Sequence, residues 1–301
     1  CFFSRQGKVL NRIHRVGNGP GEYKDIGSID VNPANGELYL KEMNRQQIHV
    51  YSLDGKFKHS FTFPEGKRMS RMCLFSPDYL IAEQESKVPD DQDANFYPYL
   101  LVSTRDGHLD SLDYVQKRNI LVKLIVNAEN HSYAYLLEPS LIRNGSRFYI
   151  GNPDSDTLFA MNPDRTLEPL LVRTPSHSEE GNKYGLFLRG AAGAYFFLTK
   201  QPMEVPMNSI ESLDLKSEEW LYDCRTQEVC RYLLKNKDDA SKRVEGIMFF
   251  CYPEDCGLAV LKSEDLMDAY EAGQLSGELK EIAAGLKADD NPVLMLIHFK
   301  K

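Results

Sequence analysis

Short runs of alternating apolar and polar residues, separated by turn-forming residues, dominate the chain, and stretch 17–63 shows the pattern most clearly. This stretch contains the runs Ser28–Val31, Glu37–Leu40, Ile48–Tyr51 and Lys56–Phe63. Asn35-Gly36 and Asp54-Gly55 separate two pairs of these runs, and both dipeptides are strong signals for tight hairpin turns. The stretch is therefore predicted to form four antiparallel strands, the pattern of one propeller blade.

The third strand, turn and fourth strand of this unit recur along the chain, as expected of a repeat architecture. The copies begin at Phe3, Tyr51, Ser103, Phe159 and Tyr222, so that their starts are 48, 52, 56 and 63 residues apart. Hairpins that fit the first and second strands lie at Ile29–Lys41, Met72–Glu83, Leu136–Ile150, Leu186–Thr199 and Gly246–Leu261.

We therefore predict an all-β, six-bladed β-propeller that forms a single domain over residues 1–301. The apolar run Pro292–Phe299 is expected to share a blade with the N-terminal strands, because an unpaired sheet edge promotes aggregation. The chain opens on a third strand, so the first blade is expected to be truncated at its N-terminus. Counting alone also allows five blades.

Residues 264–288 depart from the β pattern and predict a short helical insertion in the last blade. Leu266, Met267 and Tyr270, and then Leu279, Ile282, Ala283 and Leu286, recur at helical spacing. Gly273 is expected to end the first helix and Ser276 to cap the second. The apolar stripe is expected to pack on the sheets, with a partner-binding helix as the alternative.

Three motifs together resemble a known group of proteins. They are Gly-Asn-Gly-Pro-Gly-Glu-Tyr at 17–23, Asp156-Thr-Leu-Phe before a third strand, and Asp-Asp-Asn-Pro-Val-Leu-Met-Leu-Ile at 289–297. The chain resembles, over essentially its whole length, the Bacteroidetes six-bladed β-propeller proteins, a TolB/NHL-like group largely without assigned function. The resemblance implies an exported protein, often a lipoprotein on or near the outer membrane, and implies no active site.

The composition limits the classes of partner that this chain is expected to bind. A net charge of -8 argues against nucleic acid or an anionic membrane as the main partner. No apolar run approaches membrane-spanning length, and any export signal or lipid anchor is expected upstream of this sequence. The protein is expected to be periplasmic or associated with the outer membrane, and a monomer. Cys1 is read as an ordinary strand residue in preference to a lipidated one.

Two pairs of cysteines flank turns, Cys224 with Cys230 and Cys251 with Cys256. Each pair is close enough in sequence to form a disulfide across adjacent strands, and free, buried thiols are the alternative. The histidines and cysteines show no zinc-ligand spacing.

The loops that resemble ligand-binding motifs each lack part of the motif. The Gly-rich stretch 17–22 lacks the Lys-Ser/Thr of a phosphate loop, and Gly19 and Gly21 are read as residues with positive φ between blades. Asp91, Asp93 and Asn95 begin like a calcium loop, but Phe96 occupies the position of its turn glycine. No cofactor is expected, with calcium in an irregular site as the alternative. The side chains of Asn152, Asp154 and Asp156 are expected to hydrogen-bond to the backbone of their own loop.

Loop lengths locate the expected function. Turns between strands one and two, and three and four, are short. Connections on the other face are long, and they are the helical insertion and the segments Gln84–Tyr97, Gln116–Tyr133, Thr174–Gly185, Gln201–Glu219 and Lys235–Glu245. A binding surface is expected on this long-loop face, with candidate residues Tyr23, Glu42, Asn44, Arg45, Tyr97, Asp154 and Tyr184.

No catalytic motif is present in the sequence. The favoured function is a non-enzymatic exported binding or scaffold module for a glycan, a peptide or a partner protein. The alternative is a propeller enzyme of the lactonase or lyase type, with a divalent metal in the central channel. Fold alone does not decide between these functions.

Overall fold

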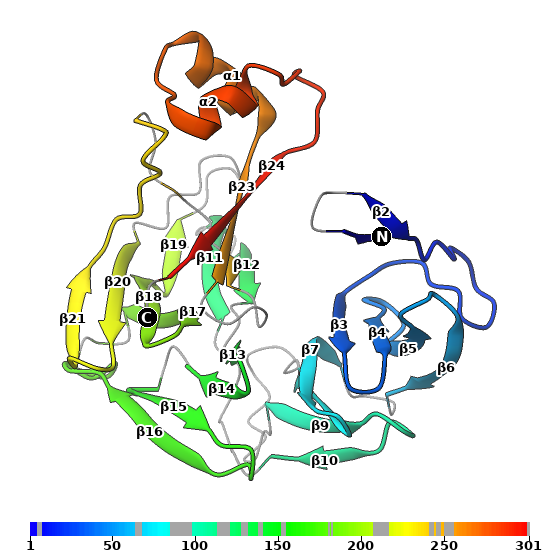
Figure 1. The fold of residues 1–301 in the computed structure, drawn as a ribbon. Helices are drawn as coiled ribbons and strands as arrows, with labels where there is room; N and C mark the ends of the chain where they lie inside the picture. Colours follow the sequence, from blue (N-terminus) through cyan, green and yellow to red (C-terminus); the bar gives the residue numbers. More distant parts are fainter. Residues whose placement is uncertain are drawn as a thin grey trace. The chain divides into compact units, whose positions relative to one another are not determined.

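The computed structural model describes two compact units, Cys1–Asn119 and Ile120–Lys301 (Figure 1). The described residues are 1–4, 8–63, 68–84, 98–112, 121–127, 132–137, 141–151, 155–179, 181, 183–206, 217–240, 244, 248–249 and 256–299. Within these residues the fold is almost entirely antiparallel β-sheet, with two short helices near the C-terminus.

The first four-stranded sheet confirms the predicted unit. Its strands are β3 (Ser28–Asn32), β4 (Glu37–Lys41), β5 (Gln47–Ser52) and β6 (Phe57–Thr62), paired in chain order. Gly36 and Gly55 have φ of 62° and 87°, in the left-handed region that the Asn-Gly and Asp-Gly turns require. The turns therefore form where the sequence places them.

The first unit contains a second four-stranded sheet and a small N-terminal pair. The second sheet contains β7 (Met69–Ser76), β8 (Tyr79–Gln84), β9 (Tyr99–Ser103) and β10 (Leu109–Ser111), and β1 (Phe2–Phe3) pairs with β2 (Val9–Asn11). Asp30 on β3 accepts a hydrogen bond from the Leu74 N–H on β7 at 2.5 Å. The Asn32 side chain donates to the Pro77 carbonyl oxygen at 3.0 Å. These contacts fix the turns of the two sheets at one end.

The second unit repeats the four-stranded pattern twice. One sheet contains β13 (Leu141–Asn144), β14 (Arg147–Ile150), β15 (Thr157–Met161) and β16 (Leu167–Val172). The next contains β17 (Tyr184–Ala192), β18 (Tyr195–Pro202), β20 (Glu218–Asp223) and β21 (Glu228–Arg231). A bulge between Leu188 and Gly190 interrupts the β17–β18 ladder at Arg189.

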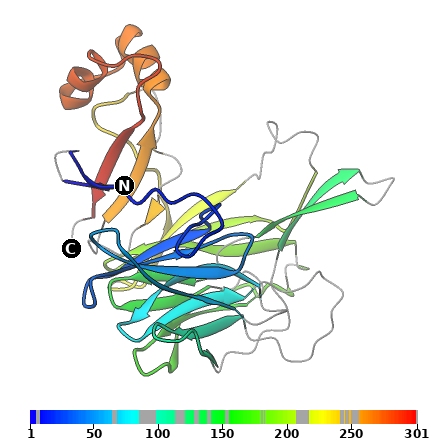
Figure 2. The ribbon, with the colours of Figure 1, turned by 90° about the vertical axis from the view of Figure 1, so that its right-hand side faces the viewer.

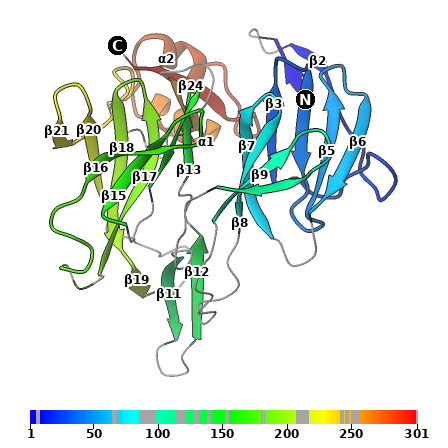
Figure 3. The same cartoon turned by 90° about the horizontal axis from the view of Figure 1, so that it is seen from below.

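Two connections that we expected to be plain loops contain strands of their own. The Gln116–Tyr133 connection leads into β11 (Leu121–Asn127), which pairs with β12 (Ser132–Leu137), and the Gln201–Glu219 connection contains β19 (Glu204–Pro206). β19 pairs in parallel with β11, across about 80 residues of sequence (Figure 3). The loop reading was wrong here, because β11 forms a local hairpin with β12 and β19 finds its partner, β11, far away in the chain.

The helical insertion is confirmed. The last sheet contains β22 (Met248–Phe249), β23 (Cys256–Leu261) and β24 (Val293–His298), and α1 (Ser263–Glu271) and α2 (Gly277–Ala283) lie between β23 and β24. Gly273 follows α1 with φ of 69°, and Ser276 is the N-cap of α2, without a side-chain capping bond. In the second unit, the helices lie apart from the β11–β12 hairpin (Figure 2).

The helices pack through the predicted stripe only in part. Leu266, Leu279 and Ala283 are buried with Ala269 and Leu275, against Leu261 and Val293 of the sheet. Tyr270 and Ile282 remain 38% and 39% exposed. The stripe is narrower than predicted, because each helix is only two turns long and buries a single row of side chains.

The two ends of the chain belong to different units. β1 and β2 pair with each other in the first unit, and β24 pairs with β23 in the second unit. The blade shared by the N-terminal strands and Pro292–Phe299 stays a prediction, because it would join the two units.

The cores lie between successive sheets. In the first unit, Tyr39, Ile48 and Val50 pack against side chains of β7, β8 and β9, which include Leu74, Leu80 and Leu100. In the second unit, Tyr149 and Leu158 pack with Leu188, Phe196 and Leu198. Trp220 packs against this second core. Each sheet therefore depends on its neighbour for burial of one face.

The cysteine pairs are not bridged where the structure describes them. Cys224, Cys230 and Cys256 are free thiols, and Cys251 lies outside the described residues. Cys230 pairs with Leu221 in the β20–β21 ladder, three residues away from Cys224. This offset is too long for the Cα separation of a disulfide.

The loop at 17–23 yields a stability test. Gly21 has φ of 69°, as predicted, and a Cβ there would lie 2.4 Å from Cγ of Phe57. Gly19, contrary to expectation, is not in the positive-φ region, and a Cβ there would meet only the Glu22 carboxylate, at 3.1 Å. We expect Gly21→Val to lower the free energy of unfolding by about 3 kcal/mol and Gly19→Val to lower it by less. Urea unfolding of both variants measures this, and equal losses would contradict the assignment.

Candidate functional site

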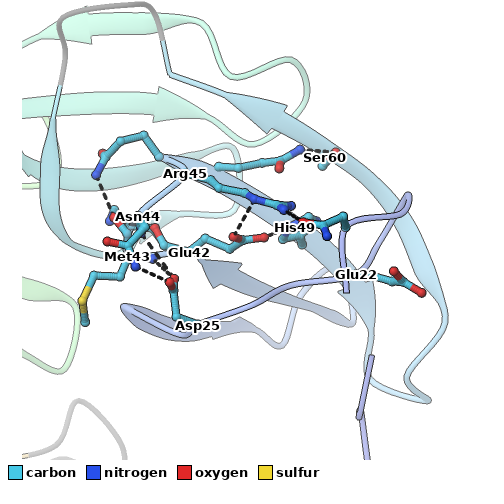
Figure 4. A network of polar contacts seen from close by, with 12 residues as sticks. Glu22, Asp25, Glu42, Met43, Asn44, Arg45, His49 and Ser60 are labelled. Carbon is cyan, nitrogen blue, oxygen red and sulfur yellow. Dashed lines mark hydrogen bonds and ion pairs between the residues drawn. The ribbon is translucent and has the colours of Figure 1, made fainter. Parts of the chain in front are cut away.

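The connection between β4 and β5, residues 42–46, is organised by Asp25, which precedes β3 (Figure 4). Asp25 Oδ1 accepts hydrogen bonds from the backbone N–H groups of Met43 at 2.7 Å and Asn44 at 3.3 Å. Its Oδ2 accepts a bond from the Asn44 side-chain amide. The bond from the Asn44 side chain is the main cause that holds the pKa of Asp25 below its usual value, so Asp25 stays ionised and fixes the turn.

A buried acid–imidazole pair lies beneath this turn. Glu42 is fully buried and His49 is 2% exposed, and Glu42 Oε1 lies 2.9 Å from His49 Nε2. Glu42 Oε2 and His49 Nδ1 make no hydrogen bond. Arg45 Nε lies 3.6 Å from Glu42 Oε2 and supplies the opposing charge. A buried carboxylate is tolerated only when it is paired, so Glu42 holds Arg45 in place.

The Gly-rich loop 17–23 covers the same side of the sheet. The Arg45 guanidinium donates to the Asn18 side-chain oxygen, and the Gly19 N–H donates to Glu22 Oε2 at 2.8 Å. Burial raises the pKa of Tyr51 to about 12, and its hydroxyl donates to the Gly21 carbonyl oxygen at 2.7 Å. A carboxylate of this chain thus occupies the Gly19 N–H, the type of donor that a phosphate loop would offer to its ligand.

Gln46 ties the turn to the neighbouring sheet of the first unit. It adopts φ of 53°, and its side-chain oxygen accepts a bond from the Met69 N–H at 2.7 Å. Its carbonyl oxygen accepts a bond from the Phe63 N–H at 3.1 Å. The turn is therefore held from both sides, by Asp25 and by the start of β7.

The structure brings four of the predicted site residues into this one region. Asn44 is exposed and the Arg45 side chain is 32% exposed, so both are available to a ligand. Glu42 is buried, and Tyr23 is 7% exposed with its hydroxyl donating to the Ile13 carbonyl oxygen at 3.1 Å. Glu42 and Tyr23 therefore support the surface from below.

Tyr184 belongs to a separate cluster in the second unit. Its ring is 40% exposed and carries the Lys200 ammonium group 5.0 Å from the ring centroid. Its carbonyl oxygen is contacted by Arg173 Nη1 at 3.2 Å and His177 Nδ1 at 2.9 Å. Tyr97 and Asp154 lie outside the described residues.

Most of the proposed calcium positions lie outside the described part of the chain. Asp91, Asp93 and Asn95 lie outside it. Asp156 accepts a bond from the His177 N–H at 2.5 Å, so the local backbone reading was wrong for this residue. Ser155 makes the local bond instead, to the Thr157 N–H at 3.2 Å. Within the described ranges, no three His, Cys, Asp or Glu side chains are grouped closely enough to hold a metal ion.

Sequence reasoning missed Asp25, His49 and Asn18. Asp25 is two residues upstream of its nearest glycine and carries no turn signature of its own. His49 was passed over as a strand residue, although a histidine in an apolar run, Ile-His-Val, indicates a buried polar partner. Each of these residues acts through a contact across the fold, which spacing in the sequence does not encode.

Comparison with known proteins gives a family and a fold. A Bacteroides fragilis protein assigned as exported superposes with a TM-score of 0.67 at 14% identity, over 99% of this chain and 84% of its own. A DUF4221 family member from Bacteroides vulgatus gives a TM-score of 0.54 at 9% identity, over 98% and 84% of the two chains. These identities show a shared fold alone. No curated protein sequence matches the chain.

Residues 1–298 match DUF4934, a domain of unknown function, and the chain belongs to that family. Across the residues that the structure describes, no helix is long and apolar enough to span a membrane.

The ionised state of Asp25 gives a pH prediction. Because the folded-state pKa of Asp25 is lowered, its charge stabilises the fold above the unfolded pKa near 4, and this contribution is lost as pH falls through the folded pKa. We expect Asp25→Asn to be less stable than the wild type at pH 7, with the difference shrinking towards pH 3. Urea midpoints at the two pH values measure this. A difference that is the same at both would show that the charge is irrelevant.

Proposed function

We propose that this member of the DUF4934 family is an exported β-propeller that binds a ligand through its long-loop face, without catalysis. Support for the architecture comes from the meander order of the sheets, in which consecutive strands pair as in propeller blades. Within the described residues, four four-stranded meanders, the three-stranded β22–β23–β24 sheet and the β1–β2 pair support our proposal of six blades. A crystal structure with a different blade count would overturn this number.

The observation that carries the binding proposal is the braced β4–β5 turn. Asn44 and Arg45 reach solvent, and each is fixed by a partner that the fold supplies: Asp25 for Asn44, and buried Glu42 for Arg45. Polar groups held in this way lose little conformational entropy when they bind, which favours recognition. A solvated turn without a ligand would not require a buried counterion.

The proposed localisation rests on a structural neighbour and on the resemblance in the sequence. The Bacteroides fragilis neighbour is assigned as exported, and the family resemblance in the sequence implies the same. We place the protein in the periplasm or on the outer membrane, with a lipid anchor as the means of attachment. Membrane fractionation of cells that express the full-length gene, with and without detergent, tests this assignment.

The ligand of the proposed binding module is a glycan, a peptide or a partner protein.

The alternative function, a lactonase- or lyase-type enzyme, requires a divalent metal at the central channel. Metal analysis of the purified protein separates the two functions, because a stoichiometric, tightly held Ca²⁺ would favour the enzyme.

Two matched pairs of substitutions test the choice of face. Asn44 and Arg45 lie at the β4–β5 end of the first unit, whereas Asn35 and Arg105 lie in turns at the opposite strand ends. We expect Asn44→Ala and Arg45→Ala to weaken binding of a hit from a glycan and peptide panel by about tenfold each. Asn35→Ala and Arg105→Ala should leave it unchanged, as measured by calorimetry. A ligand that depends on Asn35 and Arg105 instead would overturn the proposal.

A further inference from the structure

His49 is a titratable side chain buried beneath the β4–β5 turn. It is 2% exposed, and its Nε2 lies 2.9 Å from Glu42 Oε1. An ionised carboxylate only accepts hydrogen bonds, so Nε2 carries the proton of this bond. His49 Nδ1 makes no hydrogen bond. The buried imidazole is therefore neutral, because a second proton, on Nδ1, would have no acceptor.

The charged and titratable groups in this region come from the segment before β3, from β4 and β5, and from the turn between those strands. They are Arg15, Glu22, Tyr23, Asp25, Lys41, Glu42, Arg45 and Tyr51. Lys41 donates to the carbonyl oxygen of the next residue at 3.1 Å, whereas Glu22 and Asp25 accept bonds from backbone N–H groups. The Tyr51 ring lies 6.4 Å from the imidazole, centroid to centroid. In the described part of the chain these contacts leave His49 Nδ1 unpaired.

Glu42 links His49 to Arg45 (Figure 4). Its Oε1 faces the imidazole, and its Oε2 lies 3.6 Å from Arg45 Nε. Oε2 makes no hydrogen bond, so the guanidinium is attracted to Glu42 by charge alone. This attraction requires the full negative charge of the carboxylate. A proton on His49 would place a positive charge at the other oxygen, so that the imidazole and the guanidinium would compete for one carboxylate.

We propose that His49 is a pH sensor that controls the orientation of Arg45. At neutral pH His49 is uncharged, and the charge of Glu42 holds the guanidinium. When the pH falls through the range in which imidazoles titrate, about pH 8 to 5, His49 binds a proton and forms an ion pair with Glu42, and Arg45 is released. The inference rests on the proposed binding function, because Arg45 is one of the two side chains that we assign to the ligand.

The rest of the turn is expected to keep its structure when Arg45 is released. The bond from the Asn44 side chain is the main cause that holds the pKa of Asp25 below its usual value, so Asp25 stays ionised while an imidazole titrates. Asp25 therefore continues to hold Asn44 and the turn backbone. The switch acts on one of the two proposed binding side chains and leaves the other in place.

Nuclear magnetic resonance of the full chain, without any ligand, tests this inference. The Cε1–H signal of His49 is assigned by its loss in H49Q, and the Nε–H signal of Arg45 by its loss in R45Q. We expect the two signals to shift with one common midpoint as the pH is lowered from about 7.5 to about 5.5. The side-chain amide signals of Asn44 should not shift with that midpoint, because their partner Asp25 stays ionised.

Two matched variants show whether His49 is the group that titrates. Glutamine in H49Q retains an N–H donor for Glu42 but has no proton to gain, so the Arg45 signal should become independent of pH in this range. H14Q removes an exposed histidine of the first unit and should leave both titrations unchanged. An Arg45 signal that still titrates in H49Q would overturn the inference. An Arg45 signal that stays constant while His49 titrates, or a His49 that keeps one charge state, would overturn it too.

A double-mutant cycle gives a second readout that does not depend on H49Q. The coupling energy between Glu42 and Arg45 is obtained from urea unfolding of the wild type, E42Q, R45Q and E42Q/R45Q. We expect this coupling to fall by more than half between about pH 7.5 and about pH 5.5, because protonated His49 takes over the carboxylate. An equal coupling at both pH values would contradict the switch.

The ligand panel separates this inference from the proposed function. A ligand whose binding depends on Arg45 equally at both pH values would overturn the switch and leave the binding face intact. Failure to find any ligand that depends on Asn44 or Arg45 would refute the proposed function, whereas the common midpoint of His49 and Arg45 would still support the switch.

Discussion

Each four-stranded sheet in this chain can bury only one of its faces by packing against the next sheet, and the rest of the structure depends on that requirement. Tyr39, Ile48 and Val50 would be exposed on an isolated sheet, but they are buried because β7, β8 and β9 supply the opposing side chains. At about 25 cal/mol per Å² of apolar surface, this shared burial is the main favourable term. It also places successive turns at common ends, where loops can act together.

The parts of the fold that sequence predicted are those that local chemistry decides. Gly36 and Gly55 adopt positive φ in their turns, and Gly273 does so after α1, because few other residues accept that geometry. The small sheet of β11, β12 and β19 was missed, since a parallel pairing between Leu124 and Val205 has no local signature. Gly19 was misread for a similar reason, because a glycine next to a carboxylate looks the same in sequence as a glycine in a left-handed turn.

For the candidate site, the sequence indicated the exposed residues but not the residues that support them. Asn44 and Arg45 stand out in a short polar connection between apolar runs. The residues that fix them come from elsewhere: Asp25 from the segment before β3, and His49 from the neighbouring strand. Tyr23 was expected to reach a ligand, yet an aromatic ring after a Gly-rich loop is just as well suited to anchor that loop, and its hydroxyl bond to Ile13 does so.

The buried Glu42 explains why this turn differs from an ordinary surface turn. Removing a carboxylate from water costs several kcal/mol, and its partners here, His49 at 2.9 Å and Arg45 at 3.6 Å, leave one oxygen without a hydrogen bond. An apolar residue at this position would cost less if stability were the only requirement. The carboxylate does what an apolar side chain cannot do, because its charge holds a guanidinium at the surface in a fixed direction. The burial of Glu42 therefore costs stability but fixes the direction of the Arg45 guanidinium. A fixed direction is what recognition of a charged partner requires.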